Sequence, residues 1–117
     1  KYFLKHKYYL GIQIRYINKM SYKLLSISES PRKEKKFVAI FINKKTGVQK
    51  TTHFGAKGMS DFTIHKDPKR KQRYIRRHRV REDWSDPTSA GSLSRWVLWN
   101  KPSLEASIES YKKRFRL

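Results

Sequence analysis

A dense run of cationic residues extends from Lys66 to Arg81, and it is the part of the sequence best suited to a chemical role. It holds nine Lys or Arg among sixteen residues and one acidic residue, Asp67. Guanidinium and ammonium groups in such numbers favour phosphate oxygens, to which Arg donates in a bidentate manner. A helix made from this segment would turn at least one row of cations away from the domain. The expected phosphate contacts are Lys69, Arg70, Arg73, Arg76, Arg77 and Arg79.

The composition of the whole chain also indicates a polyanionic partner. Its 117 residues include 29 Lys or Arg against 9 Asp or Glu, which gives a formal net charge of +20. A chain with this charge repels itself unless anions or acidic surfaces neutralise it. The same residues would also suit a solvated surface that only maintains solubility, or a surface that docks on acidic faces of other proteins. Charge alone does not separate these readings.

A second candidate contact is Lys57, which lies between Gly55 and Gly58 in the stretch HFGAKGMSD. A Gly-x-x-Gly loop with a neighbouring Lys lets backbone N–H groups approach a phosphate. Two glycines at this spacing are more often simple turn residues. If the loop binds phosphate, it should lie close to the cationic segment, because few residues separate the two.

His53, Asp61 and His65 are the residues from which a metal or catalytic site would be built. The histidines lack the i, i+4 spacing of a helical zinc site, and no nucleophile elbow accompanies Ser60. The sequence has no Cys, which excludes thiolate metal sites and disulfides. We therefore expect no enzymatic activity, no metal and no cofactor, and a metal-dependent nuclease centred on these three residues is the weakest alternative.

Trp99 is the tryptophan best placed to stack on a nucleic-acid base. Trp96 falls on the apolar face of an expected helix, and Trp84 lies just beyond the cationic segment, where it would close the core. Trp99 is free of both constraints and is a candidate stacking platform. Arg95 and Lys101 extend the positive surface near it.

The pattern of apolar residues predicts an α+β domain, a three-stranded antiparallel β-meander followed by three α-helices packed on one face. The expected strands cover residues 22–27, 36–42 and 48–54, and the expected helices cover 68–81, 92–99 and 103–115. Asp67 and Pro68 are good start signals for the first helix, because Asp accepts from orphan N–H groups and Pro suits the first turn. The second and third helices have apolar faces that would cover the sheet.

Residues 1–19 differ in composition from the remainder. They lack an initiating Met and consist mainly of Lys, Tyr, Phe, Ile, Leu and Asn, whereas Met20 opens an ordinary stretch, MSYKLLSIS. We expect residues 1–19 to be translated upstream sequence, or else a genuine flexible extension, and residues 20–117 to form a single small basic domain. No run of eighteen apolar residues and no secretory signal is present, so neither secretion nor membrane spanning is expected.

Four separated blocks occur in order along the chain: HFGAKGMSDFTIHKD, RYIRRHRVREDW, AGSLSRWVLWNKPSLEASI and YKKRF. In these blocks the sequence resembles a family of small uncharacterised basic proteins of nucleocytoplasmic large DNA viruses that infect algae and protists. The resemblance covers residues 20–117, and its members begin near a similar Met-Ser-Tyr-Lys opening. It implies a viral origin, with a location in the virion or in the nucleus or cytoplasmic viral factory of the infected cell. It implies no activity and no catalytic residues.

The sequence therefore predicts a non-catalytic viral protein that binds nucleic acid, DNA in the first instance, mainly through the phosphate backbone. The main alternative is a minor virion or capsid protein that uses the same basic surface to dock on acidic surfaces of other virion proteins. The choice between DNA and RNA and the oligomeric state stay open.

Overall fold

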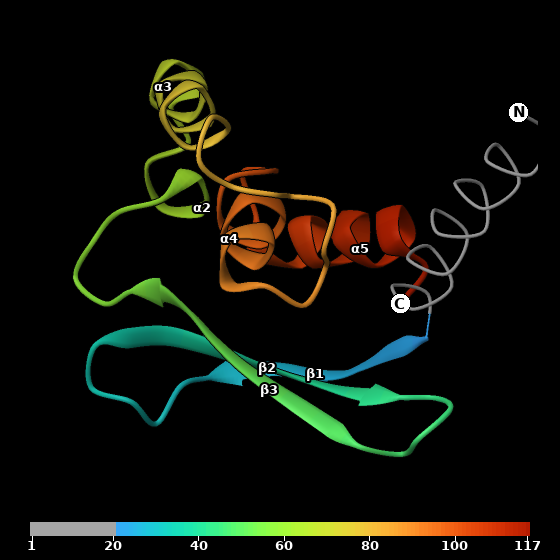
Figure 1. Cartoon of the computed structure of the whole chain (residues 1–117). Helices are drawn as coiled ribbons and strands as arrows, with labels where there is room; N and C mark the ends of the chain where they lie inside the picture. Colours follow the sequence, from blue (N-terminus) through green and yellow to red (C-terminus); the bar gives the residue numbers. More distant parts are fainter. Residues whose placement is uncertain (1–20) are drawn as a thin grey trace, which may run out of the picture.

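The computed structural model describes residues 21–117, so the predictions about residues 1–19 lie outside the described range. Within this range, a three-stranded antiparallel sheet is followed by helices (Figure 1). The strands are β1 (Tyr22–Glu29), β2 (Lys35–Asn43) and β3 (Gln49–Ala56). The helical elements are α2 (Phe62–His65), α3 (Pro68–His78), α4 (Ala90–Leu93), the π-helix η1 (Ser94–Leu98) and α5 (Leu104–Phe115). The predicted α+β meander is confirmed.

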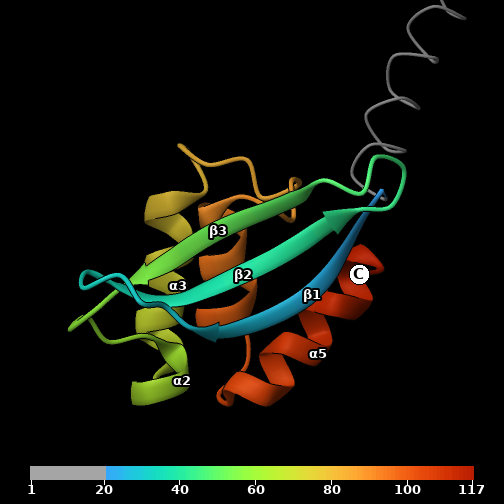
Figure 2. The same cartoon turned by 90° about the horizontal axis from the view of Figure 1, so that it is seen from below.

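The central strand, β2, supplies Ala39 and Phe41 to the core, and β3 supplies Phe54. Strand β2 pairs with β1 on one side and β3 on the other, as its β-branched and aromatic composition predicts. Figure 2 shows the helices grouped behind one face of the sheet. The buried cluster between the two layers consists of Ala39, Phe41, Phe54, Leu93, Val97, Leu98 and Tyr111.

The second layer departs from the predicted helix over 92–99. The Trp99 N–H donates to the Ser94 carbonyl at 3.0 Å, one residue further back than in an α-helix, so a wide π-turn follows α4. Leu93, Val97 and Leu98 are all buried in this arrangement. The third predicted helix is confirmed as α5, which begins at Leu104. Among residues 21–117, no helix combines the length and the apolar character needed to cross a bilayer.

Helix α3 lies further from the sheet than α4 does, and it is displaced to the side of α2 (Figure 1 and Figure 2). It begins where the sequence predicts, since the Asp67 carboxylate accepts from the Lys69 N–H at 2.9 Å and Pro68 occupies the first turn. It ends at His78 and does not continue to residue 81. The His78 carbonyl accepts from the N–H groups of Arg81 and Glu82 in a turn that follows the helix.

Candidate nucleic-acid interface

Helix α3 is fixed to the domain through one face that centres on Tyr74. The Tyr74 side chain is 6% exposed, and its ring stacks on Trp99 with centroids 4.3 Å apart and an interplanar angle of 3°. The His78 ring stacks on Tyr74 at 4.2 Å. Ile75 is half-buried on the same side. This aromatic stack determines which side of α3 is turned inward.

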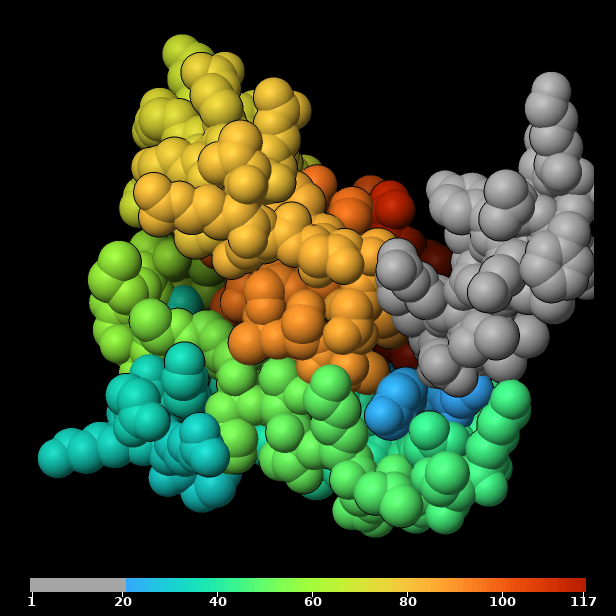
Figure 3. Space-filling model, in the orientation of Figure 1, coloured from blue at the N-terminus to red at the C-terminus, as the bar shows by residue number. Residues whose placement is uncertain are grey.

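The opposite side of α3 carries the predicted phosphate contacts. Five of these contacts, from Lys69 to Arg77, lie within the helix. At 3.6 residues per turn, their side chains fall in an arc of about 120° and extend about 12 Å along the helix axis. All five are exposed, and so is Arg79 at the C-cap. In the space-filling view, α3 stands out from the body of the molecule (Figure 3). The group, hereafter the α3 row, consists of Lys69, Arg70, Arg73, Arg76, Arg77 and Arg79.

None of the α3 row forms a salt bridge within residues 21–117. The salt bridges of this range join other residues: Lys36 to Asp61, His78 to Glu82, and Lys112 to Glu109. Asp67 lies at the start of the helix, and its carboxylate accepts from the backbone of the first turn, chiefly the Lys69 N–H; this hydrogen bond lowers its pKa, and the charge of Arg73 lowers it further. The α3 row is therefore a one-sided cationic surface with no salt-bridge partner in this range.

Lys71 is the cation of α3 that turns inward. Its Nζ donates to the Asn100 carbonyl at 2.7 Å and lies 5.0 Å from the centroid of the Phe62 ring. Burial lowers the Lys71 pKa, and the nearby charges of Arg95 and Lys101 lower it further. Lys71 thus links α3 to the end of η1, and it is not available to an external phosphate in the way that the α3 row is.

Lys57 is exposed and lines a hollow together with Glu29, and Arg77 lines a second hollow of about 380 Å³. Lys36 and Asp61 line both hollows, so the two adjoin. The neighbouring glycines have structural roles. Gly55 has a φ of +79°, and a Cβ there would lie 2.9 Å from Leu98 Cδ1, so glycine is needed for packing. Gly58 occupies a turn closed by the hydrogen bond from the Met59 N–H to the Ala56 carbonyl. Both glycines therefore act as turn and packing residues, and a phosphate contact by Lys57 stays a prediction.

Trp99 is not the free platform that the sequence predicts. It is half-buried, one face of its ring is stacked on Tyr74, and the His65 ring lies 5.3 Å away. In the sequence, Trp99 lies just outside the apolar face of the expected helix over 92–99. The sequence does not show that Tyr74 of α3 packs on the Trp99 indole. The stacking role is replaced by a structural one, in which Trp99 anchors α3.

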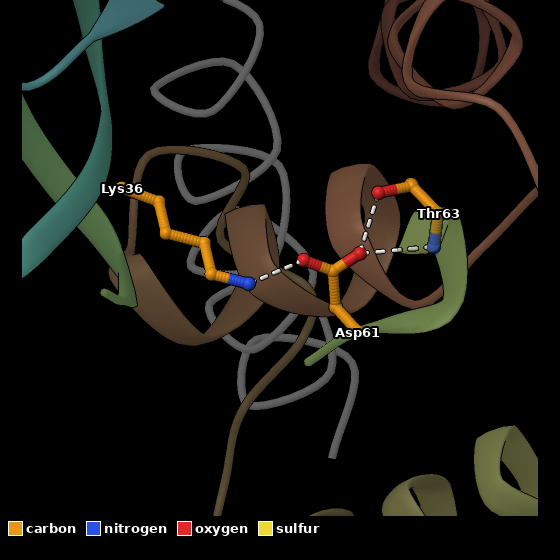
Figure 4. A network of polar contacts seen from close by, with 3 residues as sticks. All are labelled: Lys36, Asp61 and Thr63. Atoms are coloured by element: carbon orange, nitrogen blue, oxygen red, sulfur yellow. Dashed lines mark hydrogen bonds and ion pairs between the residues drawn. The ribbon is translucent and has the colours of Figure 1, made fainter. Parts of the chain in front are cut away.

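The three residues of the nuclease alternative have separate partners. Asp61 is 2% exposed and accepts from the Lys36 Nζ at 2.6 Å and from the Thr63 N–H at 2.9 Å (Figure 4). His53 Nδ1 lies 2.7 Å from the Ser30 hydroxyl. His65 Nδ1 accepts from the N–H of Asp67.

These partners give Asp61 and His53 structural roles, whereas His65 also has a buried Nε2 without a hydrogen-bond partner among residues 21–117. Asp61 caps α2, and the two histidines stabilise local backbone and side-chain positions. Within residues 21–117, no group of three His, Cys, Asp or Glu side chains could hold a metal ion. The geometry gives the nuclease alternative no support.

Two further arginines form a cationic cluster that the predicted contacts do not include. Arg95 of η1 and Arg114 of α5 both lie against the ring of Trp96. The sequence shows that Arg95 is near Trp99, but Arg114 is distant along the chain, and only the packing of α5 on η1 brings it there.

Residues 25–78 match a family of unknown function (DUF5754). No curated protein and no solved structure matches the chain. The matched segment runs from Leu25, within β1, to the last residue of α3, so it contains nearly all of the sheet and most of the α3 row and leaves out α4, η1 and α5. Over that segment the chain is similar to a family whose function is unknown.

Proposed function

We propose that this protein binds nucleic acid without catalysis, through contacts between the α3 row and the phosphate backbone. The observation that carries the proposal is that the whole row is exposed and has no carboxylate partner within residues 21–117. The aromatic stack on the other side of α3 keeps these cations directed outward.

The dimensions of the row are suitable for a backbone contact. A length of about 12 Å faces roughly three or four phosphates of one strand, since phosphates follow each other at about 3.4 Å along the axis of B-DNA. Each neutralised phosphate releases condensed counterions, so the affinity does not depend on sequence and falls with salt. With Trp99 covered by Tyr74, the α3 row supplies no aromatic platform for bases. Two duplexes of unrelated sequence should therefore bind with similar affinity.

The test is a fluorescence-anisotropy titration of a labelled duplex with a triple variant, Arg73→Gln, Arg76→Gln and Arg77→Gln. Each lost phosphate contact costs about fivefold near 0.15 M salt, so the triple variant should bind roughly a hundredfold more weakly than the wild type.

The matched control changes Lys33, Lys44 and Lys45 to Gln. These exposed lysines lie in the loops that connect the strands, and their replacement removes the same total charge. The control should bind within a few-fold of the wild type. Equal weakening in the two triple variants would mean that net charge, and not the α3 row, carries the binding.

A further inference from the structure

Two guanidinium groups lie on one indole ring at the junction of η1 and α5. The Arg95 Cζ is 4.1 Å from the centroid of the Trp96 ring, and the Arg114 Cζ is 3.8 Å from it. The Phe115 ring meets the same indole in a T-shaped contact at 6.4 Å. Stacking of a guanidinium on an indole is attractive and holds both cations in defined positions.

Neither guanidinium is paired with a carboxylate within residues 21–117. Arg95 is half-buried, and both its burial and the nearby charge of Arg114 lower its pKa. Its Nε is buried and has no hydrogen-bond partner. Two like charges held together, one of them partly desolvated, are costly unless an anion joins them.

The backbone at the end of η1 holds this cluster without neutralising it. Arg95 Nη1 donates to the Trp99 carbonyl at 2.8 Å, and Lys71 Nζ donates to the next carbonyl, that of Asn100. Carbonyls at a helix C-terminus carry partial negative charge and attract cations. Two neutral acceptors do not balance the charges of Arg95, Arg114 and Lys71, so the cluster keeps a net positive charge.

We propose that Arg95 and Arg114 form a discrete phosphate-binding site beside Trp96, separate from the α3 row. Both Cζ atoms lie within about 4 Å of one ring centroid, so they are at most about 8 Å apart. Arg95 also lies against Trp84, its Nη1 donates to the Trp99 carbonyl and its Nε is buried. The phosphate would therefore accept from Arg95 Nη2 and from the guanidinium group of Arg114. The ligand is a phosphate group, which either a nucleic-acid backbone or a free phosphate compound can supply. The site depends on contacts of η1 and α5, so it stands independently of the function proposed for α3.

The test follows the Arg Nε–Hε signals of ¹⁵N-labelled protein by NMR, during titration with sodium phosphate against sodium chloride at constant ionic strength. The buried Nε–H of Arg95 is shielded from solvent exchange, which makes its signal observable. Phosphate should shift this signal with a saturable midpoint on the order of millimolar, and chloride should leave it in place.

Three variants define the site. Arg114→Gln should abolish the saturable shift, and Arg114→Lys should weaken it several-fold because a single ammonium replaces a bidentate fork. Lys113→Gln removes the same charge from an exposed neighbour that has no ring contact, and it should respond as the wild type does. The backbone amide spectrum shows that each variant is folded. The proposal is overturned if chloride and phosphate give equal shifts, or if Arg114→Gln and Lys113→Gln respond alike.

A duplex oligonucleotide then identifies the source of the phosphate. If the backbone occupies the site, DNA shifts the Arg95 signal, and Arg114→Gln weakens DNA binding more than Lys113→Gln does. If inorganic phosphate binds but the two variants bind DNA equally, the site takes a free phosphate compound. The variant with Arg73, Arg76 and Arg77 changed to Gln should keep the phosphate-dependent shift of the Arg95 signal. The failure of one proposal therefore does not affect the other.

Discussion

Replacement of Tyr74 with Ala should destabilise the protein by about 3 to 5 kcal/mol, the usual cost of removing a buried aromatic ring. Tyr74 is 6% exposed, and its ring is covered by Trp99 on one side and by His78 nearby. No other side chain of α3 is buried, so the helix has no second anchor of comparable size. Loss of the ring should also loosen α3 and weaken nucleic-acid binding, although no cation has been removed.

Urea unfolding, monitored by far-ultraviolet circular dichroism, measures this cost without relying on tryptophan emission. The matched control is Tyr74→Phe, which keeps the ring stack. The Tyr74 hydroxyl has no hydrogen-bond partner among residues 21–117, so this variant should unfold within about 1 kcal/mol of the wild type. A loss below about 1 kcal/mol for Tyr74→Ala would refute the role of the stack in positioning α3.

Three further predictions concern stability. Asp61→Asn should cost about 3 to 5 kcal/mol in urea unfolding, because it leaves the mostly buried Lys36 ammonium without its counter-ion; a cost near zero would show that the pair is not coupled. Gly55→Ala should lower the unfolding free energy by about 1 to 3 kcal/mol, since its φ is positive and the added Cβ meets Leu98; a thermal scan unchanged from the wild type would contradict this. Folding lowers the pKa of Asp67, so the ionised carboxylate stabilises the native state fully above the ordinary Asp pKa, and this stabilisation is lost as the pH falls through the lowered pKa. Asp67→Asn still caps the helix but does not titrate, so between about pH 5 and pH 2 this variant should lose less stability than the wild type.

The elements with strong local signals could be predicted from the sequence. The apolar run in β2 indicates a central strand, and Asp67 with Pro68 fixes the start of α3 because the cap is a local interaction. The sequence also shows that most of the chain's cations lack an internal partner, since nine acidic residues cannot pair with 29 basic ones, but it does not show which cations these are.

The remaining features depend on contacts between residues that are distant in the sequence. Helix α2 has only four residues, too few to show a periodic pattern. Trp99 is covered by Tyr74, and Arg114 meets Arg95 on Trp96, only because of how the helices pack. The π-turn at Ser94 changes the helical period, so a pattern read at 3.6 residues per turn predicts one continuous helix over 92–99.

The salt dependence of nucleic-acid affinity tests the central claim most directly. If the α3 row contacts about three or four phosphates, a plot of log affinity against log salt concentration should have a slope near −3 for the wild type. Removal of Arg73, Arg76 and Arg77 should make this slope shallower by about 2.7, because three counterion-releasing contacts are lost. A triple variant with the same slope as the wild type would contradict the account, since it would show that these arginines do not contact phosphate.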